Sequence, residues 1–75
     1  MAVRVVLADD HSVVREGLRA LLEAAGGFEV VECVGTAAEA IRSATTTRPD
    51  VLVLDIGLPD ASGIEAAQQI RRSAP

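Results

Sequence analysis

Three short apolar runs, each followed by a segment with helical periodicity, constrain the fold of this 75-residue chain more than any other feature. The runs are VRVVLA at 3–8, FEVVECV at 28–34 and VLVLD at 51–55. Their β-branched residues and weak alternation favour strands of a parallel sheet, covered on both faces. The glutamates of the second run indicate an edge strand with one side near water. Strands that alternate with helices pair in parallel through right-handed crossovers, so the order predicts a doubly wound α/β fold.

The segment after the first run has the spacing of an amphipathic helix, expected over 13–25. Ser12 is its expected N-cap, and the two glycines at 26–27 are expected to end it. The expected buried face consists of Val14, Leu18, Leu21, Leu22 and Ala25.

Two further helices are expected, each opened by a capping box. Thr36 and Glu39 form the first box, and the threonines at 45–47 predict fraying at the end of that helix, because threonine is a weak helix former. Ser62 and Glu65 form the second box. The expected buried positions are Ala37, Ala40, Ile41 and Ala44 in the earlier helix and Ile64, Ala67 and Ile70 in the later one.

Acidic residues follow two of the three predicted strands. Asp9 and Asp10 come after the first run, and Asp55 ends the third. Open α/β sheets bind ligands at the carboxyl ends of their strands, so these three carboxylates would share one crevice if the strands are neighbours. Their mutual repulsion would be relieved by a proton or by a cation such as Mg²⁺, which prefers oxygen ligands. A carboxylate beside Mg²⁺ can act as a nucleophile toward phosphorus. A plainer role for each acid, as a turn former or helix N-cap, stays open.

Charge and composition narrow the classes of function. The formal net charge is −4 and the seven arginines are scattered apart from Arg71 and Arg72, which argues against DNA binding by this segment. The single cysteine, Cys33, allows no internal disulfide and no thiolate metal cluster. The chain has no signal-peptide core and no apolar run long enough to span a membrane, so a cytoplasmic protein is expected.

Two segments together resemble a known family: VLADDHSVVREGLRALLE at 6–23 and PDVLVLDIGLPDASGIE at 49–65. They are similar to the receiver domain of bacterial two-component response regulators, and most of all to the NarL/FixJ type, which carries a helix-turn-helix DNA-binding domain after the receiver. The resemblance covers the whole chain. It implies a flavodoxin-like fold of which residues 1–75 are the N-terminal portion, with three of five strand–helix units and no DNA-binding effector domain.

The resemblance also implies a role for each matched residue. Asp55 would accept a phosphoryl group from a phosphohistidine of a sensor histidine kinase. Asp10 would bind Mg²⁺ directly, and Asp9 would act through water or by orienting it. The backbone carbonyl of Gly57 would complete the protein ligands together with Asp55. Pro59 and Gly63 would shape the loop into the last helix. His11 could serve as an acid–base group, but we expect it to be an ordinary loop residue at the start of a helix, and Asp60 to be an ordinary surface residue of the loop.

Alternatives to a signalling receiver remain. The family's fourth-strand Ser or Thr and fifth-strand Lys have no counterpart in this chain. The chain is therefore expected to be part of a longer protein, to be completed by a second copy through edge pairing or domain swapping, or to be a shortened product that no longer signals. We do not expect an enzyme. A phosphatase that uses an aspartyl phosphate would carry a second acid where Gly57 stands. An interaction module with an idle acidic pocket is the other alternative.

Overall fold

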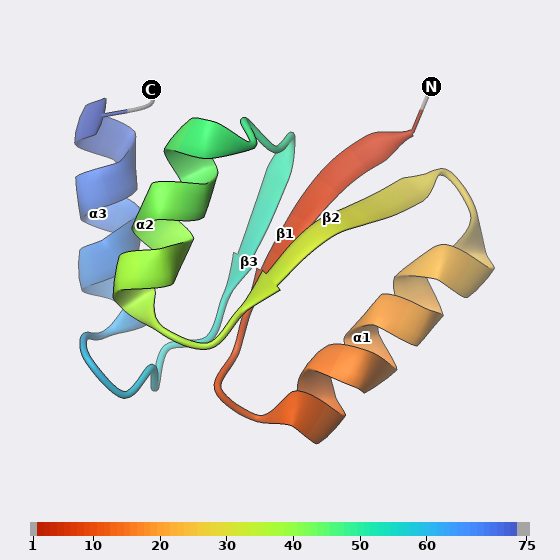
Figure 1. Ribbon diagram of the computed structural model, residues 1–75, viewed down its shortest axis with the longest axis horizontal. Coiled ribbons are helices and arrows are strands. Elements are labelled where there is room, and N and C mark those ends of the chain that lie inside the picture. The colour runs from red at the N-terminus through yellow and green to blue at the C-terminus, as the bar shows by residue number, and fades with distance from the viewer. Residues whose placement is uncertain (1, 74–75) are drawn as a thin grey trace.

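The computed structural model describes residues 2–73, which form a three-stranded parallel sheet with helices on both faces (Figure 1). The elements follow one another as β1 (Val3–Ala8), α1 (Ser12–Ala25), β2 (Phe28–Val34), α2 (Ala37–Thr46), β3 (Val51–Leu54) and α3 (Gly63–Ser73). The strand order is β2-β1-β3, so β1 is central. The alternation of strands and helices, and the partial doubly wound sheet that it predicts, are confirmed. Among the residues described, no helix is long and apolar enough to cross a bilayer.

Alternate residues of β1 point to opposite faces of the sheet, and two core clusters result. Val6 and Ala8 face α2 and α3, where they pack with Val34 of β2 and with alanines of α2. Val5 and Leu7 face α1, where they pack with Val30, Leu18 and Leu22. All four of these β1 side chains are at most 2% exposed, so residues 5–8 of the strand are apolar on both faces.

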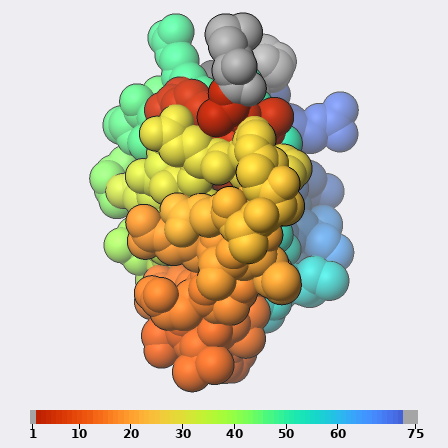
Figure 2. Space-filling model, turned by 90° about the vertical axis from the view of Figure 1, so that its right-hand side faces the viewer, coloured from red at the N-terminus to blue at the C-terminus, as the bar shows by residue number. Residues whose placement is uncertain are grey.

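Helix α1 covers only part of its face of the sheet. Leu18 and Leu22 pack on β1 and β2, but Val14 is 44% exposed and Leu21 70% exposed. The buried face expected for this helix is therefore wrong at Val14, Leu21 and Ala25, which lie outside the strip that touches the sheet. Figure 2 shows α1 over the lower part and β2 over the upper part of one side of the molecule.

The N-cap of α1 also differs from the expectation. His11 occupies the N-cap position rather than Ser12, and its side chain makes no capping hydrogen bond. The turn into the helix is instead stabilised by Asp9, whose carboxylate Oδ1 accepts a hydrogen bond from the His11 N–H at 2.8 Å. An aspartate that binds the backbone two residues further on starts such a turn without a capping side chain.

Helix α2 matches the prediction at its start and departs from it at its end. The Thr36 hydroxyl accepts a hydrogen bond from the Glu39 N–H at 3.1 Å, as a capping box requires. The helix does not fray at its threonines but continues to Thr46. The hydroxyls of Thr45 and Thr46 both donate to the Arg42 carbonyl, which supplies partners to the last turn.

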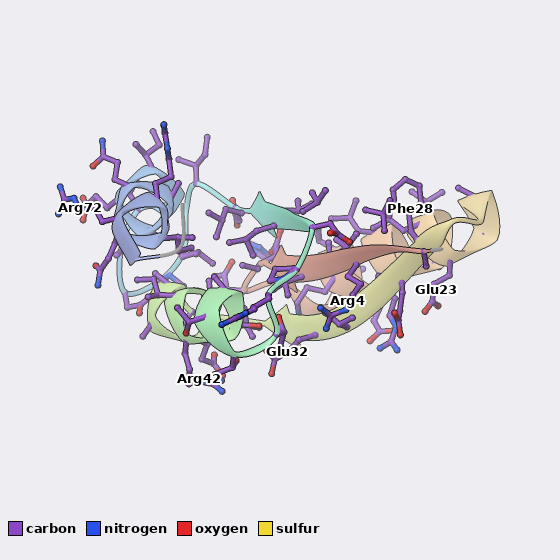
Figure 3. All side chains as sticks on the ribbon, turned by 90° about the horizontal axis from the view of Figure 1, so that it is seen from above. Arg4, Glu23, Phe28, Glu32, Arg42 and Arg72 are labelled. Atoms are coloured by element: carbon purple, nitrogen blue, oxygen red, sulfur yellow. The ribbon has the colours of Figure 1, made fainter. Side chains whose placement is uncertain are left out.

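Strand β2 contains a bulge that brings a glutamate onto the α2 side. The pairing with β1 shifts after Val5, so that Val6 lies opposite Glu32. Ser43 of α2, which is fully buried, donates a hydrogen bond to the Glu32 carboxylate. Figure 3 shows Glu32 beside α2, whereas Arg42 lies on the outer side of that helix. The bulge thus places the Glu32 carboxylate, on an edge strand, where the Ser43 hydroxyl can donate to it.

Strand β3 is an edge strand in this chain. Leu52 and Leu54 pack against the α2–α3 cluster, while Val51 and Val53 on the α1 side are 44% and 40% exposed. The predicted burial of this strand on both faces is therefore met on one face only. Within the described residues β3 pairs only with β1, so its other side is an open edge of the sheet.

Helix α3 packs beside α2 on the same face of the sheet (Figure 1). Ala66 is its buried contact at 1% exposure, whereas Ile64, expected in the core, is 59% exposed. Ala67 and Ile70 are half-buried. The Ser62 hydroxyl caps the helix by accepting from the Ile64 N–H at 3.0 Å. The expected face is rotated because α3 leans against α2, so small residues rather than Ile64 fill the contact.

Candidate phosphoacceptor and metal site

The carboxyl ends of β1 and β3 lie side by side, which brings the predicted acids together. Ala8 pairs with Leu54, the last residue of β3. The hydrogen bonding continues beyond the strands, since the Asp55 N–H donates to the Ala8 carbonyl at 2.8 Å and the Asp9 N–H donates to the Val34 carbonyl at 3.0 Å. The sheet therefore delivers both aspartates to the same edge.

Four side chains form one cluster at this edge. A ligand atom of each lies within 4.8 Å of the others in the set Asp9, Asp10, His11 and Asp55. Asp9 and Asp55 are half-buried, while Asp10 and His11 are more exposed. A site of this kind is held by the sheet on one side and is open to an incoming ion or partner on the other.

His11, expected to be an ordinary loop residue, is the fourth member of the cluster. Its Nδ1 lies 3.1 Å from Oδ1 of Asp9 and 3.0 Å from Oδ1 of Asp10. The hydrogen bond with Asp9, followed by the charge of Asp10, raises the pKa of His11 above its ordinary value of 6.5, and the charge of Asp55 adds to this. Its position next to the acidic pair was the only sequence signal available.

The loop between β3 and α3 holds Asp55 from the other side. The Gly57 N–H donates to Oδ1 of Asp55 at 3.2 Å, which restrains the rotation of the carboxylate. Leu58, at 7% exposure, anchors the loop in the core. Gly57 thus lies in the site, while metal binding by its carbonyl stays a prediction.

Gly63 closes the loop against the backbone of the acceptor residue. Its N–H donates to the Ile56 carbonyl at 3.0 Å. A Cβ atom at this position would lie 2.3 Å from the carbonyl oxygen of Asp55, so only glycine allows this approach. The expectation that Gly63 shapes the loop is confirmed; Pro59 lies in the same loop and is exposed.

Asp60 was expected to be an ordinary surface residue of this loop, and that expectation is wrong. Its carboxylate accepts hydrogen bonds from two backbone N–H groups of α2, those of Ala37 at 2.7 Å and Ala38 at 3.0 Å. These bonds lower the pKa of Asp60 below its ordinary value of 3.8. The contact joins residues more than twenty positions apart, so no local pattern in the sequence could have indicated it.

The cluster suits a hard divalent cation by the chemistry of its donors. Three carboxylates that meet at one edge repel one another, and a cation bound by their oxygens relieves the repulsion. Mg²⁺ takes oxygen ligands, needs only one or two carboxylates and keeps several waters, which an open site permits. A carboxylate in this setting is also placed to attack phosphorus.

Comparison with known proteins agrees with this geometry. Residues 5–75 match the family model described as the response regulator receiver domain. The chain is 47% identical over 73 residues to the DNA-binding transcriptional activator DevR/DosR of Mycobacterium tuberculosis, covering 97% of this chain and 34% of that protein. It is 43% identical over 70 residues to the transcriptional regulatory protein LiaR of Bacillus subtilis, covering 93% of this chain and 33% of that protein.

Solved structures show the same similarity. A two-component response regulator of the LuxR family from Aurantimonas sp. superimposes with a TM-score of 0.93 at 43% identity, covering 99% of this chain and 53% of that one. The signal receiver domain of the putative response regulator NarL from Mycobacterium tuberculosis gives 0.92 at 35% identity, covering 96% and 58%. The chain thus spans about a third of the length of its curated relatives and just over half of these solved chains.

Proposed function

Because this chain belongs to the response regulator receiver domain family, we propose that it accepts a phosphoryl group on Asp55 from a phosphohistidine of a sensor histidine kinase. One observation carries the proposal: Asp9, Asp10 and Asp55 converge at the carboxyl edge of the sheet. A role as a turn former would explain each acid separately, but it would not explain why the three carboxylates lie together.

Mg²⁺ is the cofactor that we propose for this step. Asp9, Asp10, Asp55 and the carbonyl of Gly57 would hold the ion through oxygen atoms, in keeping with its preference. When bound, the ion supplies positive charge that offsets both the repulsion among the carboxylates and the charge of the incoming phosphoryl group.

The residues of this chain would act mainly by positioning. A carboxylate oxygen of Asp55 attacks the phosphorus, and the P–N bond to the kinase imidazole breaks with its electron pair going to nitrogen. Protonated on its other ring nitrogen, that imidazole leaves as the neutral base. The Gly57 N–H holds the attacking carboxylate in orientation. The partial exposure of the site leaves room for the donor to approach in line.

The larger protein context is also a proposal. The curated relatives quoted above are transcriptional regulators of which this chain matches about a third. We propose that the chain is the input part of such a regulator in the cytoplasm, that it makes no contact with nucleic acid itself, and that it is not an enzyme. The open edge of β3 is compatible with pairing to a second copy, the alternative raised by the sequence.

A phosphorylation assay tests the proposal. The purified protein is incubated with Mg²⁺ and a small acyl-phosphate or phosphoramidate donor, and intact mass is measured. The wild type and Asp50→Asn, a matched change at the opposite end of β3, should gain one phosphoryl group, and Asp55→Asn should not. Absence of the adduct in the wild type would refute the proposal for this chain, in favour of an interaction module with an idle pocket or of a shortened product that no longer signals.

A further inference from the structure

The N-terminus of α2 lies next to the loop between β3 and α3, and the Asp60 carboxylate joins them (Figure 1). Each oxygen has its own partner: Oδ1 accepts from the Ala37 N–H at 2.7 Å and Oδ2 from the Ala38 N–H at 3.0 Å. A carboxylate held at both oxygens cannot rotate or slide without losing a bond. The contact therefore defines where the loop lies relative to α2.

Capping of α2 alone does not explain this contact. The helix has its own local cap, since the Thr36 hydroxyl accepts from the Glu39 N–H and the Thr36 carbonyl accepts from the Ala40 N–H. Asp60 takes the two N–H groups that remain at the first turn. These groups carry the positive end of the helix dipole, which favours a carboxylate there. Water could accept hydrogen bonds from these two N–H groups, so the helix does not depend on Asp60. The main effect of the contact is therefore to hold the loop in place.

The contact of Asp60 with α2 attaches the middle of the β3–α3 loop, whose two ends are held by other hydrogen bonds. Its beginning is held by the hydrogen bond from Asp55 N–H to the Ala8 carbonyl, and its end by that from Gly63 N–H to the Ile56 carbonyl. Between them, Leu58 is buried, while Gly57 is exposed and has open space where a Cβ would stand. Apart from the bond that its N–H donates to Oδ1 of Asp55, Gly57 therefore has little packing of its own, and its position depends on the attachments on either side.

We propose that Asp60 is a positioning residue for the phosphoacceptor site: by tying the β3–α3 loop to the N-terminus of α2, it holds the backbone of Gly57 in the place where it meets Asp55 and the cation. The inference rests on the proposed function of Asp55. It assigns no chemical step to Asp60, which touches neither the acids of the cluster nor the reacting atoms.

A purely stabilising role for Asp60 makes a different prediction, and Thr36 offers the matched control. Thr36→Ala removes a hydrogen bond from the same helix N-terminus but leaves the loop attached. Asp60→Ala removes both hydrogen bonds to the loop. Asp60→Asn keeps an oxygen that can accept from one N–H, so it serves as the milder variant if Asp60→Ala does not fold.

Three measurements on the purified protein separate the roles: the thermal midpoint, the backbone amide shift of Gly57 without metal, and the Mg²⁺ dissociation constant from amide shifts during titration. Asp60→Ala should move the Gly57 amide and weaken Mg²⁺ binding about tenfold, the lower end for groups that orient a ligand. Asp60→Asn should fall between it and the wild type. Thr36→Ala should lower the thermal midpoint but leave both Gly57 and Mg²⁺ binding unchanged.

The outcomes distinguish this inference from the function on which it rests. If Asp60→Ala leaves the Gly57 amide and the Mg²⁺ affinity as in the wild type, or if Thr36→Ala changes them equally, Asp60 is only a cap and the inference is overturned. If the wild type binds no Mg²⁺ and takes up no phosphoryl group, the proposed function fails. The metal-free shift of Gly57 still reports whether Asp60 positions the loop.

Discussion

Replacing Gly63 with alanine is the most direct test of how the acceptor loop is built. A Cβ at this position would lie 2.3 Å from the carbonyl oxygen of Asp55 and 3.1 Å from the Cα of Ile56. Both are backbone atoms, so no side chain can turn aside to make room. Gly63 does not have a positive φ angle, and the cost of the alanine is therefore steric rather than conformational.

The size of the effect follows from these distances. The Asp55 backbone must retreat by about 1 Å to bring the contact from 2.3 Å to an ordinary 3.4 Å. Overpacking of a close contact costs about 1–3 kcal/mol. Alanine recovers up to about 1 kcal/mol of this through its better helix propensity, and less at the first residue of a helix. We expect a net loss of about 1–2 kcal/mol in the free energy of unfolding, together with slower phosphoryl uptake because Asp55 is displaced.

Gly17 provides the control for this prediction. It lies in α1 with no atom within 4 Å of the position that a Cβ would take. Gly17→Ala should therefore stabilise the protein by about 0.5–1 kcal/mol. The two variants are compared by urea unfolding followed by far-ultraviolet circular dichroism. The reasoning is refuted if Gly63→Ala is as stable as the wild type while Gly17→Ala shows its expected gain.

Three further predictions concern other contacts. Asp9→Asn should lower the pKa of His11 toward 6.5, since the hydrogen bond to Asp9 is the main cause of its elevation, and an NMR titration of the ring would measure this. Because the pKa of His11 is raised in the folded state, the pair stabilises the fold fully below pH 6.5 and loses this effect as the pH rises through the folded pKa. Ser43→Ala should cost about 1 kcal/mol in urea unfolding, because the Glu32 carboxylate loses its buried partner, and an unchanged midpoint would show that water replaces the hydroxyl. If the chain pairs with a second copy through β3, Val53→Thr should reduce the self-association measured by sedimentation, because it makes the open face of β3 less apolar. Equal association of both proteins, or none in the wild type, would contradict pairing through this face.

Much of the fold could be predicted because it depends on local pattern. The apolar runs at 3–8, 28–34 and 51–54 are strands, and the segments between them are helices, because hydrophobic periodicity reports directly on burial. The pattern also placed Asp9 and Asp55 at the same edge of the sheet, since parallel strands end at the same edge, but it left open whether their strands are neighbours, which the β1–β3 pairing shows.

Other features could not be predicted because they depend on which surfaces happen to meet. Leu21 and Ile64 have the spacing of core residues but are exposed, since α1 covers only part of its face and α3 leans on α2. The threonine-rich end of α2 remains helical because the hydroxyls of Thr45 and Thr46 donate to the Arg42 carbonyl. Intrinsic helix propensity does not include such hydrogen bonds.

The sequence by itself determined the α/β class, the family and the acids at the ends of the strands, because each depends on short stretches of neighbouring residues. Only the tertiary structure showed that His11 joins the acidic cluster and that Asp60 reaches the N-terminus of α2. The approach of His11 to Asp55 and the bonds from Asp60 to α2 join segments far apart in sequence, and such distances are decided only when the elements pack together. From the sequence, Asp60 was expected to be an ordinary surface residue. In the folded chain its carboxylate links the β3–α3 loop to α2.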